Sequence, residues 1–277
     1  MIQRSTNDEK IRTKAMTALL QLMGERYHPD AVPSFIGAER CRIIKQATGC
    51  NDPYAELKKL SNEKALALMP KLEYYVNSKP SEQKLEATLK VACIGNVIEF
   101  DVPQHSSDIN DALKGLEDSF YINDCDSLKQ LIREGKKVLL LTDNAGEIAF
   151  DRLIVRWLRN VGCYVVVAVK AGPSLNDALI EDAKSVGMTE EADRVITTGA
   201  DAIGINLRET SCEFNNEFYS SDLIISKGMA NWETLTEVPA PCPLMYVFRT
   251  KCQPVASTVN APMNVNIAKL VPTGWCL

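Results

Sequence analysis

The sequence lacks any long hydrophobic run, since no apolar segment approaches the roughly 18 residues that a membrane-spanning helix needs. Its polar start, MIQRSTNDEKIR, does not have the apolar region of a secretory signal peptide. We therefore expect a cytoplasmic protein that has no membrane partner. Positive charge is not in excess either, because 31 Lys and Arg stand against 36 Asp and Glu. A nucleic-acid partner is not expected, since binding to a phosphate backbone needs a positive surface.

Histidine is scarce and cysteine is scattered. The two histidines, His28 and His105, have no metal-like spacing, and we assign them no role. The nine cysteines form no Cys-x-x-Cys pair and are odd in number, which argues against a disulfide framework and against a zinc site. The phosphate-binding patterns GxGxxG and GxxxxGK[ST] and the GxSxG elbow of serine hydrolases are also absent.

What the sequence does contain is two kinds of periodicity. Residues 1–130 carry mostly helical spacing, including a pattern that we expect to end before Pro70, and they predict a helical N-terminal subdomain. Residues 131–277 alternate short apolar runs with helical segments, and the runs lie at 138–141, 163–169, 195–197, 222–226 and 244–248. This alternation predicts an α/β domain with a Rossmann-like, doubly wound, mostly parallel sheet.

One polar turn stands at the centre of this pattern. The apolar run Val138–Leu141 is followed by Thr-Asp-Asn-Ala-Gly-Glu and then by an amphipathic helix, so Asp143 and Asn144 should lie at the carboxyl end of a buried strand. Ligands of open α/β sheets bind at that end. An acidic turn there would repel a dinucleotide pyrophosphate unless a cation intervened.

Other polar residues should meet Asp143 and Asn144 along the same rim, namely Asp177, Lys227 and Lys251. Two carboxylates and an amide oxygen suit a hard divalent cation such as Mg²⁺ or Mn²⁺, and lysines opposite them would bind an anion. Together they fit phosphoryl chemistry.

Simpler interpretations stay open for each of these residues. Asp143, Asn144 and Asp177 are also common helix-capping residues, and exposed lysines are usually solvated. Gly146 and Gly228 are equally compatible with a role in turns alone.

The pair Gly95-Asn96 indicates a sharp turn that leaves the side-chain amide of Asn96 available to a ligand.

Several ordered motifs resemble one known family over nearly the whole chain. They are LTDNAGEIAFDRLIV, GPSLNDALIEDA, SKGMANWETL and KCQPVA, together with NDPYAELKKLSNE and IGNVIEFDV in the first half. These resemble the archaeal and bacterial branch of the metal-dependent damage-control phosphatases, first catalogued as domain of unknown function eighty-nine. Two departures are the absence of an N-terminal Cys-x-x-Cys pair and Trp232 in place of the usual tyrosine.

The resemblance implies a role for individual residues. The implied ligands of a divalent metal are Asp143, Asn144 and Asp177, which makes them the catalytic centre. The implied substrate-binding residues are Asn96, Glu147, Lys227, Gly228, Asn231 and Lys251. Glu99 stands where an aspartate is commoner in the family.

We therefore expect a divalent-metal-dependent phosphohydrolase that acts on small phosphorylated metabolites, such as sugar phosphates or damaged phosphate esters, with Mn²⁺, Ni²⁺, Co²⁺ or Mg²⁺ as cofactor. The alternatives are a methyltransferase that uses S-adenosylmethionine and a non-catalytic metabolite-binding protein. The sequence does not decide the physiological substrate, the preferred metal, the oligomeric state or whether Asp143 acts as a nucleophile.

Overall fold

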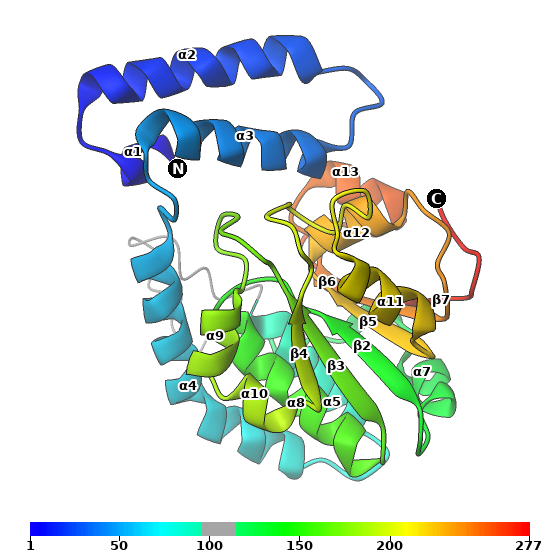
Figure 1. Ribbon diagram of the computed structural model, residues 1–277. Coiled ribbons are helices and arrows are strands. Elements are labelled where there is room, and N and C mark those ends of the chain that lie inside the picture. Colours follow the sequence, from blue (N-terminus) through cyan, green and yellow to red (C-terminus); the bar gives the residue numbers. More distant parts are fainter. Residues whose placement is uncertain (96–114) are drawn as a thin grey trace.

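A seven-stranded sheet lies at the centre of the computed structural model, which describes residues 1–95 and 115–277 (Figure 1). The predictions for Asn96 and Glu99 lie outside the described residues. From edge to edge the strands are β1 (Phe120–Asn123), β7 (Asn266–Val271), β6 (Leu244–Arg249), β5 (Leu223–Lys227), β2 (Lys137–Leu141), β3 (Tyr164–Val169) and β4 (Arg194–Thr197).

All neighbouring strands are parallel except β6 and β7. The five strands from β6 to β4 have the order of a doubly wound sheet, with β2 in the middle and the direction of winding reversing between β2 and β5. The prediction of an α/β fold with a mostly parallel sheet is confirmed.

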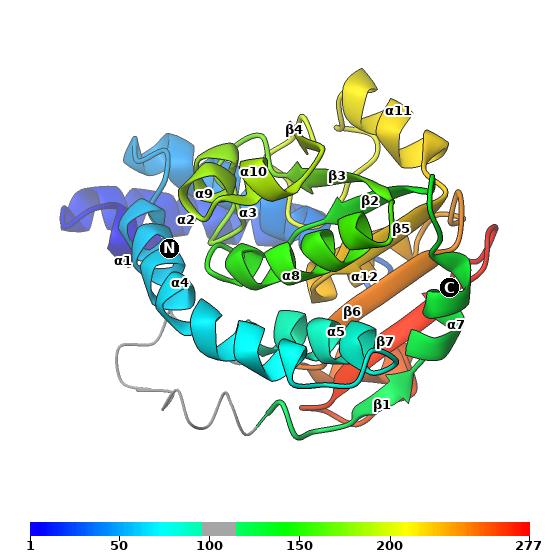
Figure 2. The same ribbon diagram turned by 90° about the horizontal axis from the view of Figure 1, so that it is seen from below.

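Helices cover both faces of this sheet (Figure 2). One face packs against α4 (Ala55–Asn77), α5 (Lys84–Ile94), α7 (Cys125–Leu131), α8 (Glu147–Asn160), α9 (Ile180–Ser185) and α10 (Met188–Glu191). The other packs against α11 (Cys212–Ser220), α12 (Met229–Leu235) and α13 (Gln253–Thr258). Successive residues of β2 alternate between these two cores, which explains why its sequence is an unbroken apolar run.

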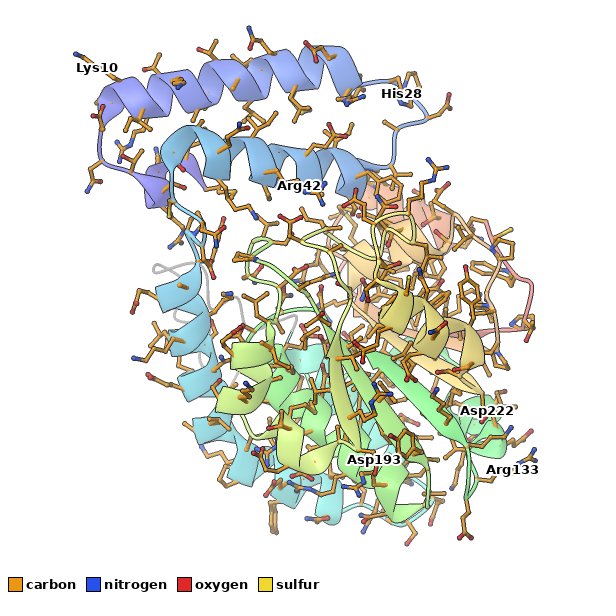
Figure 3. The ribbon with its side chains drawn as sticks, in the orientation of Figure 1. Lys10, His28, Arg42, Arg133, Asp193 and Asp222 are labelled. Carbon is orange, nitrogen blue, oxygen red and sulfur yellow. The ribbon has the colours of Figure 1, made fainter. Side chains whose placement is uncertain are left out.

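The remaining helices are α1 (Ile2–Ser5), α2 (Glu9–Arg26) and α3 (Pro33–Thr48). The hairpin α2–α3 lies beyond the carboxyl ends of the strands, and Arg42 of α3 points toward the loops there, whereas Asp193 and Asp222 lie at the opposite end of the sheet (Figure 3). The ammonium of Lys45 donates to the carbonyl of Pro173 at 2.8 Å and so ties α3 to the loop after β3. His28 sits in the turn between α2 and α3, away from the sheet.

Two predictions about helix ends are wrong. The helix α4 continues through Pro70 to Asn77, because Leu68, Met69, Leu72 and Val76 keep its apolar face buried while the proline ring is exposed. The helix expected near Asp177 begins instead at Ile180, since residues 176–178 are held by the turn after β2.

The sequence pattern also gave no sign of β1 and β7. β1 lies within residues 1–130 yet pairs with β7, and α4 and α5 share a core with α8. The division into subdomains at residue 130 therefore stays a prediction. None of the described helices is both long and apolar enough to span a membrane.

Candidate active site

The point where the winding of the sheet reverses carries charged residues on both strands. Asp143 follows the end of β2, and Lys227 ends the neighbouring strand β5. The reversal leaves a crevice at the carboxyl ends of two such strands, which is where this class of sheet binds ligands. The structure thus brings the acidic turn and the Lys-Gly motif together.

Backbone hydrogen bonds join the acidic turn to the loop that carries Asp177. The amide of Ala178 donates to the carbonyl of Asp143 at 2.8 Å, the amide of Ala145 donates to the carbonyl of Asn176 at 2.9 Å, and Asn144 and Asp177 form an antiparallel bridge. The Asn144 side chain donates to Asp143 Oδ2 at 3.1 Å. The three predicted metal ligands therefore lie in one place.

None of these three side chains caps a helix. Gly146 directly precedes α8 and Leu179 directly precedes α9, and no backbone amide at the start of either helix donates to the side chain of Asp143, Asn144 or Asp177. The capping interpretation is therefore wrong for all three residues, whose role as metal ligands stays a prediction.

Gly228 has a defined steric role beside Asp143. Its φ is +82°, and a Cβ at this position would lie 2.1 Å from Asp143 Oδ2. The missing side chain therefore leaves the space that the Asp143 carboxylate occupies against the end of β5.

Negative charge is concentrated at Asp143 and Asp177. The pKa of Asp143 is raised well above its ordinary value by burial, by Glu147 and by Asp177, although Lys227 and Lys251 oppose the rise. Burial also raises the pKa of Asp177 to about 6, against the opposing charges of Lys170 and Lys58. Within the described residues, Asp177 Oδ2 accepts no hydrogen bond, and the Lys170 ammonium lies 3.7 Å away.

The side chain of Lys227 turns into the protein interior. Its ammonium is fully buried and donates to Glu147 Oε1 at 2.5 Å, to Asp151 Oδ1 at 2.8 Å and to the carbonyl of Ala92 at 3.0 Å. Burial lowers the pKa of Lys227, but Asp151 and Glu147 outweigh burial, so the pKa is raised overall. The sequence led us to expect this ammonium on the rim, and its contact with a phosphate stays a prediction.

The other predicted substrate residues surround the same turn. Asn231 is buried and donates to the carbonyls of Lys227 at 2.8 Å and Thr142 at 3.3 Å, which joins the ends of β5 and β2. Lys251 is exposed, and its charge reaches Asp143. Glu147 packs against Gly95, where a Cβ would lie 2.4 Å from Glu147 Cγ.

Sequence reasoning missed three residues of this region: Asp151, Lys170 and Asn62. Asp151 lies four residues after Glu147 on the buried face of α8, so a second carboxylate on an otherwise apolar face was the available signal. Lys170 directly follows β3 and is buried, with its ammonium donating to the carbonyl of Gly204. Asn62 had no signal, because a polar residue in a helical pattern usually faces water.

The chemistry of these donors fits a divalent cation. In the part of the chain that the structure describes, no group of three or more His, Cys, Asp or Glu side chains forms a metal site. Asp143, Asn144 and Asp177 instead offer two carboxylates and an amide, which is an oxygen set that leaves positions for water and substrate. The raised pKa of Asp143 and the carboxylate oxygen of Asp177 without a hydrogen-bond donor are what a site for positive charge requires.

Comparison with known proteins places this geometry in a family. The model of the damage-control phosphatase ARMT1-like domain matches residues 1–267. The chain belongs to the damage-control phosphatase family. It is 32% identical to a damage-control phosphatase of Pyrococcus horikoshii over 95% of this chain and 90% of the relative, and 31% identical to a damage-control phosphatase of Archaeoglobus fulgidus over 96% and 92%. An uncharacterized protein of Methanocaldococcus jannaschii is 36% identical over 95% of this chain and 88% of its own length.

A solved structure supports the same assignment. The crystal structure of a DUF89 family protein from Pyrococcus horikoshii superposes with a TM-score of 0.86 at 31% identity, and it covers 96% of this chain and 92% of the other. The predicted family and fold are confirmed. Membership in this damage-control phosphatase family supports phosphatase activity on damaged metabolites and favours it over the methyltransferase alternative.

Proposed function

We propose that this damage-control phosphatase is a divalent-metal-dependent phosphohydrolase of small phosphorylated metabolites, such as sugar phosphates or damaged phosphate esters. The observation that carries the proposal is the pairing of the Asp143–Asn144 turn with the Asp177 loop at the reversal point of the sheet. The excess of carboxylate charge at that point favours the binding of a cation, and the bound cation would then allow an anionic phosphate to bind.

Three side chains would hold the cation, namely Asp143, Asn144 and Asp177. A divalent ion held there would supply Lewis-acid chemistry, since such ions polarise phosphate oxygens and make water more acidic. Because Gly228 has no Cβ, the Asp143 carboxylate can occupy the space beside it. The hydrogen bond from Asn144 Nδ2 to Asp143 Oδ2 orients both side chains. The protein thus supplies a preorganised oxygen site.

Positive side chains would receive the phosphate. Lys251 is exposed next to the acidic turn, so its ammonium can reach a ligand and neutralise developing charge. Lys227 is held by Glu147 and Asp151 at 2.5 and 2.8 Å, so its charge acts on the site from within the protein. Asn231 fixes the backbone at the ends of β2 and β5 through its two hydrogen bonds.

The test is phosphate release from a panel of sugar phosphates by protein stripped of metal and then supplied with Mn²⁺, Co²⁺, Ni²⁺ or Mg²⁺. We expect activity only with added metal and a loss of about 100-fold or more in Asp143→Ala. The matched control is Asp126→Ala, which removes an exposed aspartate on α7 and should keep the activity.

Two outcomes would overturn the proposal. Equal turnover by the metal-free and the metal-loaded protein would show that the reaction needs no metal. Tight binding of sugar phosphate with no hydrolysis under any of the four metals would instead leave a non-catalytic metabolite-binding protein.

A further inference from the structure

A buried asparagine on α4 reaches the acidic turn from outside the sheet. Asn62 is 4% exposed, and its Oδ1 accepts a hydrogen bond from the Gly146 amide at 2.6 Å. Gly146 closes the turn that contains Asp143 and Asn144 and is the last residue before α8. The Asn62 side chain therefore fixes the end of this turn, although it comes from a helix about eighty residues earlier in the chain.

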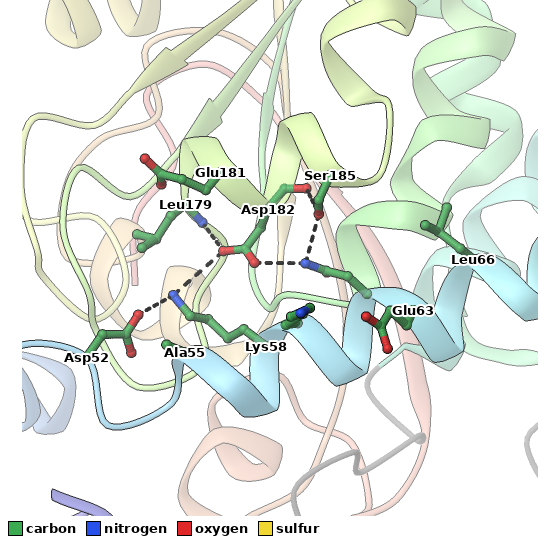
Figure 4. Close-up of a pocket in the computed structure, with 11 residues that line it drawn as sticks. Asp52, Ala55, Lys58, Glu63, Leu66, Leu179, Glu181, Asp182 and Ser185 are labelled. Carbon is green, nitrogen blue, oxygen red and sulfur yellow. Dashed lines mark hydrogen bonds and ion pairs between the residues drawn. The ribbon is translucent and has the colours of Figure 1, made fainter.

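The same side chain also holds the second ligand-bearing loop. Asn62 Nδ2 donates to Asp182 Oδ1 at 2.8 Å and to Ser185 Oγ at 3.1 Å (Figure 4). The other oxygen of Asp182 accepts from the Leu179 amide at 2.9 Å, two residues after Asp177. One asparagine and one aspartate thus connect both turns to α4.

A buried lysine completes this network. The ammonium of Lys58 lies 2.8 Å from Asp52 and 3.7 Å from Asp182, and it faces an open pocket of about 560 Å³ between α4 and α9 (Figure 4). Its charge offsets the carboxylate of Asp182, which is 7% exposed. The one ammonium therefore balances one of the two carboxylates of this network, and the buried side chains of Asn62 and Asp182 are hydrogen-bonded within the protein.

This arrangement explains a motif that the proposed reaction leaves without a role. Asp52, Lys58 and Asn62 all belong to NDPYAELKKLSNE, the segment at the start of α4. None of the three residues is among the expected ligands or substrate contacts. In the structure Lys58 and Asn62 both lie against Asp182, and Asp52 is linked to it through the ammonium of Lys58.

We propose that Asn62 and Asp182 form a clamp that holds the Asp143–Asn144 turn and the Asp177 loop in the register needed to bind a divalent cation. Asn62 is then a positioning residue that acts through Gly146 and Asp182. The inference rests on the proposed metal-dependent function. Side chains that orient metal ligands in this way typically contribute about tenfold to 100-fold to metal affinity.

An exchange of the two side chains offers a sharp test. Asn62→Asp keeps an acceptor for the Gly146 amide but places a second carboxylate against Asp182. The double variant Asn62→Asp with Asp182→Asn has the same net charge as the wild type. The amide now at position 182 donates to the carboxylate at position 62, and its oxygen accepts from the Leu179 amide. Both turns then regain their hydrogen bonds.

The experiment is a calorimetric titration of the metal-free protein with Mn²⁺, without substrate. We expect Asn62→Asp and Asn62→Ser to weaken Mn²⁺ binding by about tenfold to 100-fold. The double variant should bind Mn²⁺ within about threefold of the wild type. The control is Glu63→Gln, which changes an exposed neighbour of Asn62 that lines the same pocket, and it should bind like the wild type.

The possible results separate the two proposals. No Mn²⁺ binding by the wild type would overturn the proposed metal dependence, and the clamp with it. Normal binding by Asn62→Asp and Asn62→Ser, or failure of the double variant to recover affinity while it remains folded by circular dichroism, would overturn the clamp alone. If Asn62→Asp does not fold, Asn62→Ser decides, because it removes the side-chain amide that makes the three hydrogen bonds and adds no charge.

Discussion

Two buried lysines lie on either side of the acidic turn, and they differ in the charge that surrounds them. Lys227, at the end of β5, has two carboxylate partners, Glu147 and Asp151. Lys170, after β3, has one carboxylate, Asp177, at 3.7 Å. Burial lowers the pKa of Lys170 despite the opposing charges of Asp177 and Asp143, whereas the pKa of Lys227 is raised.

The difference shows that the number of partner carboxylates, rather than burial alone, decides the charge state of a buried lysine. At β5 the ammonium has two carboxylate partners, and burial together with the neighbouring Glu147 raises the pKa of Asp151 to about 6, against the opposing charge of Lys227. At β3 burial favours the neutral forms of both partners. Lys227 on the β5 side therefore carries a structural charge. On the β3 side an added cation would change the charge states of Lys170 and Asp177 most.

The largest expected effect is that of removing the lysine at β5. Lys227→Met leaves Glu147 and Asp151 buried without their ammonium, and we expect a loss of about 4 kcal/mol in the free energy of unfolding. Lys170→Met should cost about 2 kcal/mol, because Asp177 can take up a proton. Urea denaturation at pH 7 measures both values. An equal loss in the two variants would contradict the comparison.

A smaller change in the free energy of unfolding is expected when pH titrates Asp151, the second carboxylate partner of Lys227. Since the pKa of Asp151 rises from 3.8 to about 6 on folding, the folded state keeps this proton more tightly, and the associated stability is present below pH 4 and is lost as pH rises through 6. The shift is worth about 3 kcal/mol at about 1.4 kcal/mol per pH unit.

Urea denaturation of Asp151→Asn between pH 4 and pH 7 tests whether stability falls as the pH rises. The variant lacks the titrating group, so its stability should fall less than that of the wild type over this range. Asp126→Asn, which changes an exposed side chain on α7, is the control for the general effect of charge removal. Parallel curves for Asp151→Asn and the wild type would show that Asp151 titrates normally.

The glycine beside Asp143 allows a matched pair of substitutions. Gly228 and Gly274 have φ values of +82° and +81°, but only at Gly228 would a Cβ meet the Asp143 carboxylate. Gly274→Ala should cost about 1 kcal/mol and keep the phosphatase activity. Gly228→Ala should cost about 1 kcal/mol more and reduce activity at least about tenfold, because the carboxylate must move.

Measurements of unfolding and of phosphate release on both glycine variants separate backbone strain from the displacement of Asp143. If Gly228→Ala kept its activity, the position of this carboxylate would not matter for the reaction.

The smallest effect on stability belongs to the exposed lysine. Lys251→Ala should change the free energy of unfolding by less than about 0.5 kcal/mol, since its side chain is exposed. If Lys251 meets the substrate phosphate, the KM for sugar phosphate should rise about tenfold. Steady-state kinetics at saturating Mn²⁺ measure this, and an unchanged KM would assign phosphate binding to other groups.

The sequence predicted those parts of the fold that local patterns encode. The run Val138–Leu141 is apolar because both of its faces are covered, and the polar turn that follows it had to lie at a strand end. The strands β1 and β7 were not predicted, because β1 is a short edge strand and β7 pairs antiparallel with β6 in an otherwise parallel pattern. Pairing between such distant segments has no local signal.

The candidate site was predicted in part for a similar reason. Asp143 and Asn144 follow a recognisable strand, and Asp177 and Lys227 lie after or at the ends of other predicted strands, so their position on one rim was predictable. The family resemblance assigned their roles and added Gly228 and Asn231. The direction of the Lys227 side chain was not predictable, since it depends on Glu147 and Asp151 of α8. Asn62 lies on α4, whose packing against the acidic turn no periodicity reveals.

The placement of β7 has a consequence for how the chain assembles during synthesis. β1 is made early, but in the described structure its neighbour in the sheet is β7, near residue 270. The edge formed by β1 therefore has to wait until more than one hundred further residues have left the ribosome. We expect the strands from β2 to β6 to pair first and β1 to join the sheet last, when β7 inserts between β6 and β1.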